Sequence, residues 1–177
     1  MQRNQRYQIP KQLRQVSIWV HPEGLVVGSL FLSYHTRNGA GLEDPLAVLN
    51  EASPFVALQR HHPDELRFYN KQALVRIEYQ DDEMLMEEGL TTLHCQLAMM
   101  DGSLLAGTVR HLLPPGRARL YDYLNLNTER FVRLYVAEGV CLVNKAYIVG
   151  ATPLQEPSEG VPTWQAEATE IDATYYV

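Results

Sequence analysis

The sequence predicts a mainly β protein made of two tandem small β-barrel modules, each with one short helical turn. Three observations predict this fold class. The same blocks of residues occur twice in the same order, apolar residues recur with the period of two that half-buried strands show, and each repeated segment is too short for a two-layer sandwich. We therefore expect one barrel from residues 15–80 and a second from residues 91–153.

Matched blocks in the two halves of the chain carry the internal repeat. Each first-half block and its second-half match are Leu49-Asn50 and Leu124-Asn125, 55–58 and 131–134, and 68–75 and 142–149. The differences in length fall between the blocks, where surface loops tolerate insertions. Phe55 and Phe131 are matched aromatic residues at the start of a strand, and we expect both to be buried.

The first pair of strands in each module follows from alternation and turn chemistry. In residues 16–20 and 93–99 an apolar side chain recurs at every second position, with polar or exposed residues between, which is the pattern of a strand with one buried face. Gly24 and Gly102 follow these segments and supply the positive φ that tight hairpins need. Each module should therefore begin with two antiparallel strands.

A short helical turn should follow this first pair of strands. Asp44 can cap the free amides of a helix, and Pro45 fits the first helical position. Residues 120–125 are the second-half counterpart of this turn, with Asp122 in the place of Asp44. Capping explains both aspartates better than a role as general acids.

Charge divides the rest of the chain into three segments, although the net charge is only −6. Residues 1–14 form a basic N-terminal arm, residues 81–90 an acidic linker, and residues 154–177 an acidic tail. The arm is a candidate for peripheral contact with a membrane surface or another anion, although such a terminus is more often a solvated end. In the tail, Ile171, Tyr175 and Val177 are spaced as in a strand that could add to a sheet edge, its own or a partner's. The alternative is a disordered acidic end with a few apolar residues.

The compartment that we expect is the cytoplasm. The N-terminus lacks the apolar region of a secretory signal, and the longest apolar stretches are far shorter than a membrane-spanning helix. Cys95 and Cys141 are the two cysteines of the chain. They have no metal-like spacing, so we interpret both as reduced, buried thiols.

Residues 142–149, Leu-Val-Asn-Lys-Ala-Tyr-Ile-Val, resemble the turn between the last two strands of Sm-like and SH3-like small β-barrels. In such proteins an apolar pair, a polar turn and an Ile/Val-rich strand follow one another. The resemblance implies a small barrel and a ligand-facing turn. It makes the matched pairs Asn70-Lys71 and Asn144-Lys145 candidate binding residues for an anion or a nucleotide. The alternative is that asparagine favours the turn and lysine stays in water.

No catalytic centre or metal site is predicted. The adjacent His61 and His62 would point to opposite sides of an extended segment, and no other histidine or cysteine follows at ligand spacing. The chain also lacks a Gly-x-Ser-x-Gly nucleophile turn. We expect no enzyme activity and no cofactor.

The function that the sequence favours is protein interaction, as an assembly or accessory subunit built from a duplicated module. Repeated β modules with exposed strand edges present recognition surfaces. The alternative is a nucleic-acid or nucleotide-binding regulator of the Sm-like type, which the acidic net charge disfavours.

Overall fold

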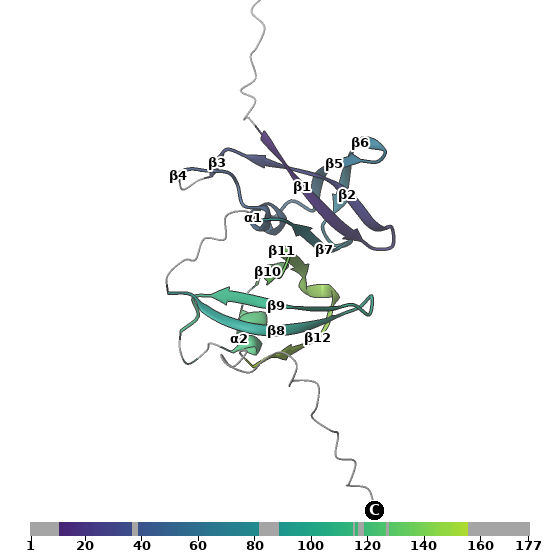
Figure 1. Cartoon of the computed structure of the whole chain (residues 1–177). Coiled ribbons are helices and arrows are strands. Elements are labelled where there is room, and N and C mark those ends of the chain that lie inside the picture. The colour runs from purple at the N-terminus through teal and green to yellow at the C-terminus, as the bar shows by residue number, and fades with distance from the viewer. Residues whose placement is uncertain are drawn as a thin grey trace, which may run out of the picture.

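Figure 1 shows a computed structural model of the chain, which describes residues 11–36, 39–81, 89–114, 116, 119–126 and 128–155. The mainly β prediction is confirmed, because most described residues belong to a ten-stranded antiparallel sheet. No helix among these residues has the length and apolar character needed to cross a membrane.

The elements of the two halves follow one another in a similar order. The first half contains β1 (Lys11–Val20), β2 (Gly24–Ser33), the ribbon β3 (His35–Thr36) and β4 (Gly39–Ala40), α1 (Pro45–Asn50), β5 (Phe55–His61), β6 (Asp64–Asn70) and β7 (Leu74–Tyr79). The second half contains β8 (Thr91–Met99), β9 (Leu104–His111), α2 (Leu120–Leu126), β10 (Phe131–Val136), β11 (Gly139–Asn144), the 3₁₀ turn η2 (Lys145–Tyr147) and β12 (Ile148–Pro153).

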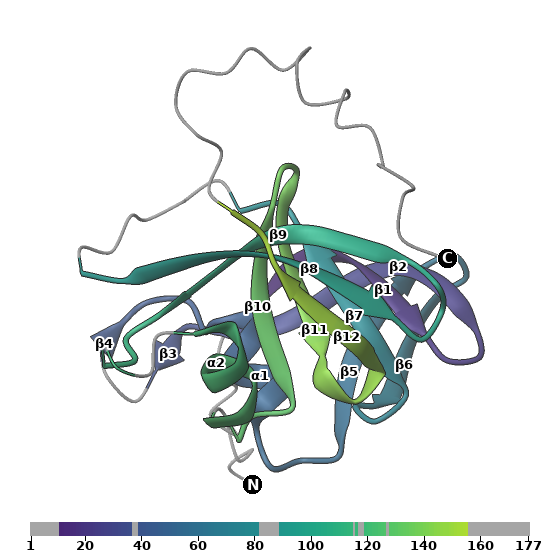
Figure 2. The ribbon, with the colours of Figure 1, turned by 90° about the horizontal axis from the view of Figure 1, so that it is seen from below.

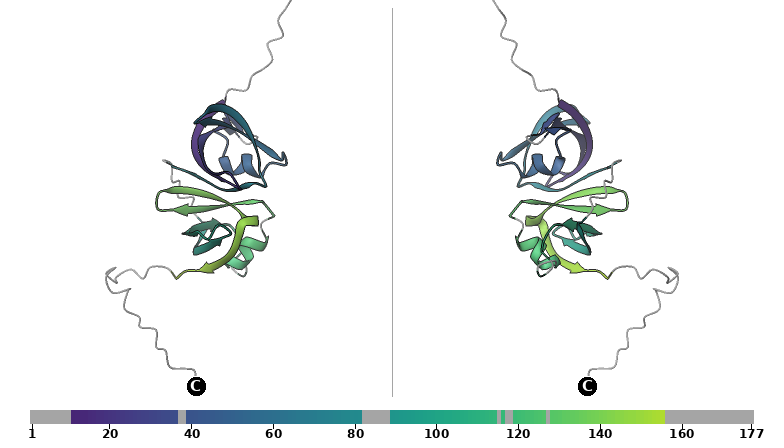
Figure 3. Two further views of the ribbon diagram at one scale, coloured as in Figure 1. Left: turned by 90° about the vertical axis from the view of Figure 1, so that its right-hand side faces the viewer. Right: turned by 90° about the vertical axis from the view of Figure 1, so that its left-hand side faces the viewer.

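The strands of each half lie in the same spatial order. The first half runs β7-β1-β2-β5-β6 and the second runs β12-β8-β9-β10-β11. The two halves are joined where β11 pairs with β7 in an antiparallel ladder. Figure 3 shows how strongly the first half of the sheet curls around α1.

The sheet is open, which differs from the expectation of two closed barrels. Its edges are β12 at one end and β6 at the other. The physical reason lies in β7, the strand that would have to pair with β6 to close the first barrel. That strand instead gives its second edge to β11 of the other half.

Local irregularities also occur at matched positions of the two halves. Val75 on β7 and Val149 on β12 are each the unpaired extra residue of a β-bulge. Gly28 and Gly107 each lie where the second and third strands of a half approach closely. A Cβ at Gly28 would lie 2.6 Å from the carbonyl oxygen of residue 59, and one at Gly107 would lie 2.4 Å from that of residue 135.

The predicted helical turn is present, with the predicted cap. The Asp44 carboxylate accepts a hydrogen bond from the Leu46 amide at 3.0 Å, and Pro45 occupies the first turn of α1. Both α-helices lie beside the curled sheet, as Figure 2 shows from below. Leu49 of α1 and Leu120 of α2 are buried in the core.

Two apolar clusters form the core, and each draws residues from both halves. The first cluster is mostly β1, β2, β5 and β7, but it also contains Phe131, Val140 and Leu142 of the second half. The second cluster is mostly β8 to β11, but it also contains Val75 of β7. The two halves therefore interlock at β7 and β11.

The expected basic arm, residues 1–14, overlaps the first strand of the sheet. The strand β1 begins at Lys11, so the last residues of the expected basic arm belong to the sheet. On that strand Arg14 donates to the Gln80 carbonyl at 2.7 Å and forms an ion pair with Asp81 at 3.3 Å. The rest of the arm, most of the acidic linker and nearly all of the tail lie outside the described residues.

Both cysteines are buried free thiols. Burial raises the pKa of Cys95 to about 11 and that of Cys141 to about 12. Neither thiol is therefore ionised to an appreciable extent near neutral pH.

Candidate functional site

The contact between β11 and β7, which we call the junction, shows how one half of the chain recognises the other. The paired residues of this ladder are Val140 with Tyr79, Cys141 with Glu78, Leu142 with Ile77, and Val143 with Arg76. The junction is heterologous, which means that it joins two different strands of the module. Leaving out the short ribbon of β3 and β4, β11 is the fourth strand of the second half and β7 is the fifth strand of the first half.

Two asparagines add side-chain hydrogen bonds at the end of this ladder where Asn144 follows Val143 and pairs with Phe131. The Asn50 amide at the end of α1 donates to the Phe131 carbonyl at 3.1 Å and accepts from the Phe131 amide at 2.9 Å. Asn144 is fully buried, and its side-chain nitrogen donates to the Leu74 carbonyl at 2.8 Å. An ion pair between Arg133 and Asp44 also crosses the junction. The junction thus joins strand pairing, apolar burial and side-chain hydrogen bonds.

The structure gives the sequence-predicted lysines a role at the helix ends. Lys71 is buried, and its Nζ donates to the Val48 carbonyl at 2.6 Å, the Glu51 carbonyl at 3.1 Å and the Ser53 hydroxyl at 3.2 Å. Burial lowers the pKa of the Lys71 ammonium. These acceptors lie at the end of α1, where carbonyls lack helical partners and a cation interacts favourably with the helix dipole.

Lys145 has a matching position in the second half. Its Nζ donates to the Leu124 carbonyl of α2 at 3.3 Å, and burial lowers its pKa as well. The asparagine of each pair shapes the turn, since Asn70 accepts from the residue 72 amide at 2.9 Å and Asn144 from the residue 146 amide at 3.1 Å. The structure brings neither pair to a common ligand pocket, and anion binding there stays a prediction.

The two sheet edges carry residues that match those of the junction but are exposed. Val140 and Leu142 of β11 have relative exposures of 2% and 0%. Their counterparts on β6, Leu66 and Phe68, have exposures of 52% and 65%. The alternating apolar residues of β6 therefore form a strand surface that nothing covers among the described residues.

Matched residues next to the junction and next to the sheet edges also differ in exposure. Phe131 is fully buried at the junction, whereas Phe55 is 52% exposed beside the β6 edge. The expectation that Phe55 is buried is therefore wrong. Phe131 packs against the core of the first half, because β11 pairs with β7 there. Beside Phe55 no described strand pairs with the outer side of β6. Val75 is 7% exposed and its match Val149 on β12 is 69% exposed.

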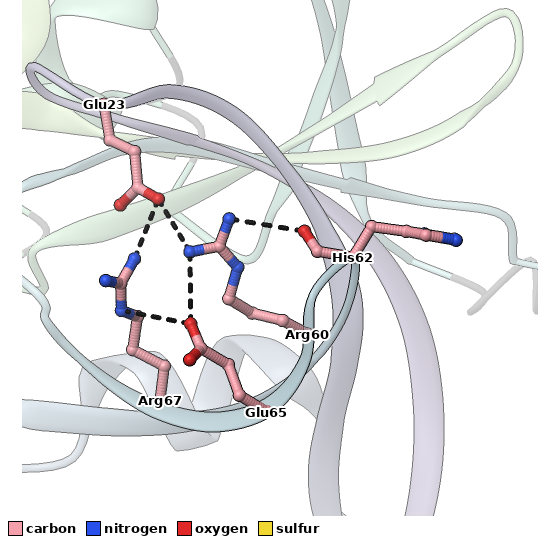
Figure 4. Close-up of polar contacts among 5 residues, drawn as sticks. All are labelled: Glu23, Arg60, His62, Glu65 and Arg67. Atoms are coloured by element: carbon pink, nitrogen blue, oxygen red, sulfur yellow. Dashed lines mark hydrogen bonds and ion pairs between the residues drawn. The ribbon is translucent and has the colours of Figure 1, made fainter.

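A network of charged side chains holds the β6 edge in place, as Figure 4 shows. Glu23, at the turn between β1 and β2, accepts from both Arg60 and Arg67 at 2.9 Å. Glu65 forms longer ion pairs with the same two arginines, at 3.5 and 3.6 Å. The hairpin of β5 and β6 is thereby tied to the neighbouring turn, which fixes the edge strand in an extended form.

The adjacent histidines do not converge. His61 lies 3.0 Å from the Ser29 hydroxyl through its Nε2. The side chain of His62 points away from the charged network in Figure 4, and only its carbonyl contacts Arg60. Within the residues that the structure describes, no group of three or more His, Cys, Asp or Glu is arranged to hold a metal ion.

A groove of about 940 Å³ opens near the junction, between β1, β7 and the hairpin of β10 and β11. Its lining includes Arg14, Glu78 and Asp81. Arg14 is paired with Asp81, and Glu78 is paired with Arg76. Glu138 also lines the groove, so its charged lining residues are one arginine and three carboxylates, and the groove offers no basic surface for an anion.

Comparisons with protein-family models, with curated proteins and with solved structures found no match for this chain. The candidate site is therefore defined by geometry alone: the exposed edges β6 and β12. Sequence reasoning named the Asn70-Lys71 turn at the end of β6 but not the exposed edges of β6 and β12, although the matched blocks at 68–75 and 142–149 contain the signal. The tail residues Ile171, Tyr175 and Val177 lie outside the described residues.

Proposed function

We propose that this protein is a non-enzymatic assembly subunit, built from a duplicated β module, that binds protein partners by strand addition at β6 and β12. The observation that carries the proposal is the contrast between matched residues. At the edges Leu66, Phe68 and Val149 are exposed, whereas the matched residues Val140, Leu142 and Val75 are buried where the two halves meet.

Strand addition suits these edges for two physical reasons. An edge strand presents a row of unpaired amide and carbonyl groups that another strand can satisfy. Leu66 and Phe68 add exposed apolar surface to that row on β6, as Val149 does on β12. Complete burial of such a side chain contributes about 1.5–3 kcal/mol, and burial of the exposed half that remains here contributes roughly half of that.

The charged network near β6 supports recognition rather than simple protection of the edge. Many proteins shield edge strands by placing charges on them, which prevents unwanted pairing. Here Arg67 is tied to Glu23 and Glu65, so the charges lie in intramolecular pairs and the apolar residues stay uncovered. A partner strand would therefore meet a fixed and largely neutralised edge.

The proposal is tested by site-specific photo-crosslinking in cells that make the protein. A photoreactive residue at Phe68 or Val149 should give a covalent adduct with one defined protein, in a yield well above that at a control position. The same residue at Leu13, a half-exposed position on the central strand β1, is the matched control and should give none. Adducts with nucleic acid alone, or equal yields at all three positions, would contradict the proposal.

A nucleic-acid-binding regulator is the second function that the sequence suggested. Lys71 and Lys145 already contact carbonyls at the ends of α1 and α2. Salt-dependent retention of the purified chain on an RNA column is the measurement that would favour this alternative.

A further inference from the structure

The structure points to a second copy of this chain as the partner at the two edges, with β6 of one copy paired to β12 of the next, head to tail. This inference rests on the proposed function, because it names the occupant of the same edges. It follows from the heterologous character of the junction. Each half has two strands that can form such an interface, a fourth and a fifth. One contact between the halves uses the fourth strand of one half and the fifth strand of the other, so one strand of each kind stays unused.

The unused strands are the counterparts of those already paired. The repeat matches β6 to β11 and β12 to β7. If β6 meets β12 in the register that β11 and β7 use, the paired residues of two copies are Leu66 with Pro153, Arg67 with Thr152, Phe68 with Ala151, and Tyr69 with Gly150. The inference therefore fixes a register and a direction as well as a partner.

The side chains that close the junction also have counterparts at the two ends of the chain. Asn50 binds the backbone of Phe131 across the junction. Its match Asn125 is exposed at the end of α2, and the match of Phe131 is the half-exposed Phe55. The Asn125 side-chain nitrogen donates to the Tyr121 carbonyl of its own helix at 2.7 Å, so Asn125 of one copy would exchange this contact for the backbone of Phe55 of the next.

A similar correspondence holds for the second asparagine. Asn144 donates to the Leu74 carbonyl at the start of β7. Asn70 is its counterpart in the first half, and Ile148 at the start of β12 is the counterpart of Leu74. The side-chain nitrogen of Asn70 should therefore donate to the Ile148 carbonyl of the neighbouring copy.

Two features distinguish the inferred contact from the junction. The ion pair of Arg133 with Asp44 has no equivalent, because Ala57 takes the place of Arg133. Pro153, in the place of Tyr79, brings no amide hydrogen to the ladder. The contact between copies should therefore be weaker than the junction and should depend on protein concentration.

The first measurement is the mass of the purified full chain in solution over a range of concentrations. We expect species larger than one chain, as closed rings or as open fibres according to the rotation between successive modules. Phe68→Glu should shift this association to at least ~10-fold higher concentration, because it places a charge in an apolar contact. Leu13→Glu should leave it unchanged. A single chain at all concentrations would overturn the inference.

The second measurement tests the register by disulfide formation between two singly substituted chains. Arg67→Cys mixed with Thr152→Cys should give a covalent dimer under mild oxidation, because facing residues of paired strands meet the distance requirement for a disulfide. Arg67→Cys mixed with Val149→Cys is the matched control, since the second cysteine then lies about 10 Å away along the strand. The native cysteines are buried and do not interfere.

The outcomes separate this inference from the proposed function. Covalent dimers of Arg67→Cys alone would mean that β6 pairs with itself, which overturns the head-to-tail arrangement. If the full chain stays single but a chain lacking residues 156–177 associates, the tail is the occupant of an edge, and the inference fails. If the purified chain stays single while the crosslinker at Phe68 captures a different protein in cells, the inference fails and the proposed function stands.

Discussion

The junction and the two sheet edges contain matched residues in opposite environments. At the junction, Phe131 and Leu142 are buried and Asn144 spans the two halves. At the β6 edge their counterparts Phe55 and Phe68 are exposed to solvent. The exposed Phe55, Leu66, Phe68 and Val149 are therefore not ordinary surface variation, because the matched residue of each is buried where the two halves meet.

The largest expected effect separates the two matched phenylalanines. Phe131→Ala should lower the free energy of unfolding by about 3–5 kcal/mol, because it leaves a cavity between the two halves. Phe55→Ala should cost less than about 1 kcal/mol in dilute solution, since its ring is largely in water already. Urea denaturation of both variants measures the difference. Equal losses would remove the contrast on which the comparison depends.

The same pair of variants sharpens the comparison when protein concentration is raised. If Phe55 becomes buried between copies, the cost of Phe55→Ala should increase with concentration, because association stabilises the folded state. The cost of Phe131→Ala should not change in the same way. A concentration-independent cost for Phe55→Ala would argue against burial of that ring.

The second effect concerns the asparagines at the helix ends. Asn50→Ala removes two hydrogen bonds to the Phe131 backbone and should destabilise the chain by about 2 kcal/mol. Asn125→Ala, at the exposed matched position, should change stability by no more than about 0.5 kcal/mol in dilute solution. Thermal or urea unfolding gives both values, and a larger cost for Asn125→Ala would reverse the comparison.

A smaller effect is expected at Lys71, where it has a pH signature. Lys71→Met removes the donor from carbonyls at the end of α1 and should cost about 1 kcal/mol near neutral pH. Burial lowers the pKa of Lys71 from its ordinary value of 10.5. Between the lowered pKa and 10.5 the unfolded chain therefore holds more protons than the folded one, so this group's contribution to stability rises with pH in that window.

The pH signature is read as a difference between two proteins. The stability of the wild-type chain minus that of Lys71→Met should increase as pH rises toward 10.5. Groups that titrate in both proteins cancel in this difference. Parallel stability curves over the same range would show that Lys71 titrates alike in the folded and unfolded chain.

The least perturbing measurement uses the two native thiols. Burial raises the pKa of Cys95 to about 11 and that of Cys141 to about 12, so the folded chain should react negligibly with a thiol reagent at pH 8. Denaturant should release two reactive thiols. Rapid reaction of one thiol in the folded chain would show that the second core cluster opens locally.

The sequence could predict the elements of this fold better than their arrangement. Alternation located β1 and β8, and the Asp44-Pro45 pair located α1 with its cap. These signals are local, because they depend on the period of two and on the chemistry of a single turn. Closure of the barrels depends on whether β7 pairs with β6 or with β11, and both strands are rich in apolar residues.

The same limit explains what was missed at the candidate site. Phe55 and Phe131 have similar sequence surroundings, so nothing local separates a buried ring from an exposed one. Lys71 follows an asparagine in a turn, a pattern that usually leaves lysine in water, but its Nζ reaches the end of α1 across the folded chain. The burial of these side chains depends on which distant segments of the chain meet. The position of the sheet edges depends on the same thing.

Amide hydrogen exchange of the purified chain, measured at low and at high concentration, reports on both sheet edges at once. Because β6 pairs with β5 and β12 with β8, only the outward-pointing amides of these edges should exchange fast when dilute and become protected as concentration rises, while those of β7 and β11 are protected throughout. Unprotected β6 and β12 amides at every concentration would contradict the claim that these two edges bind each other.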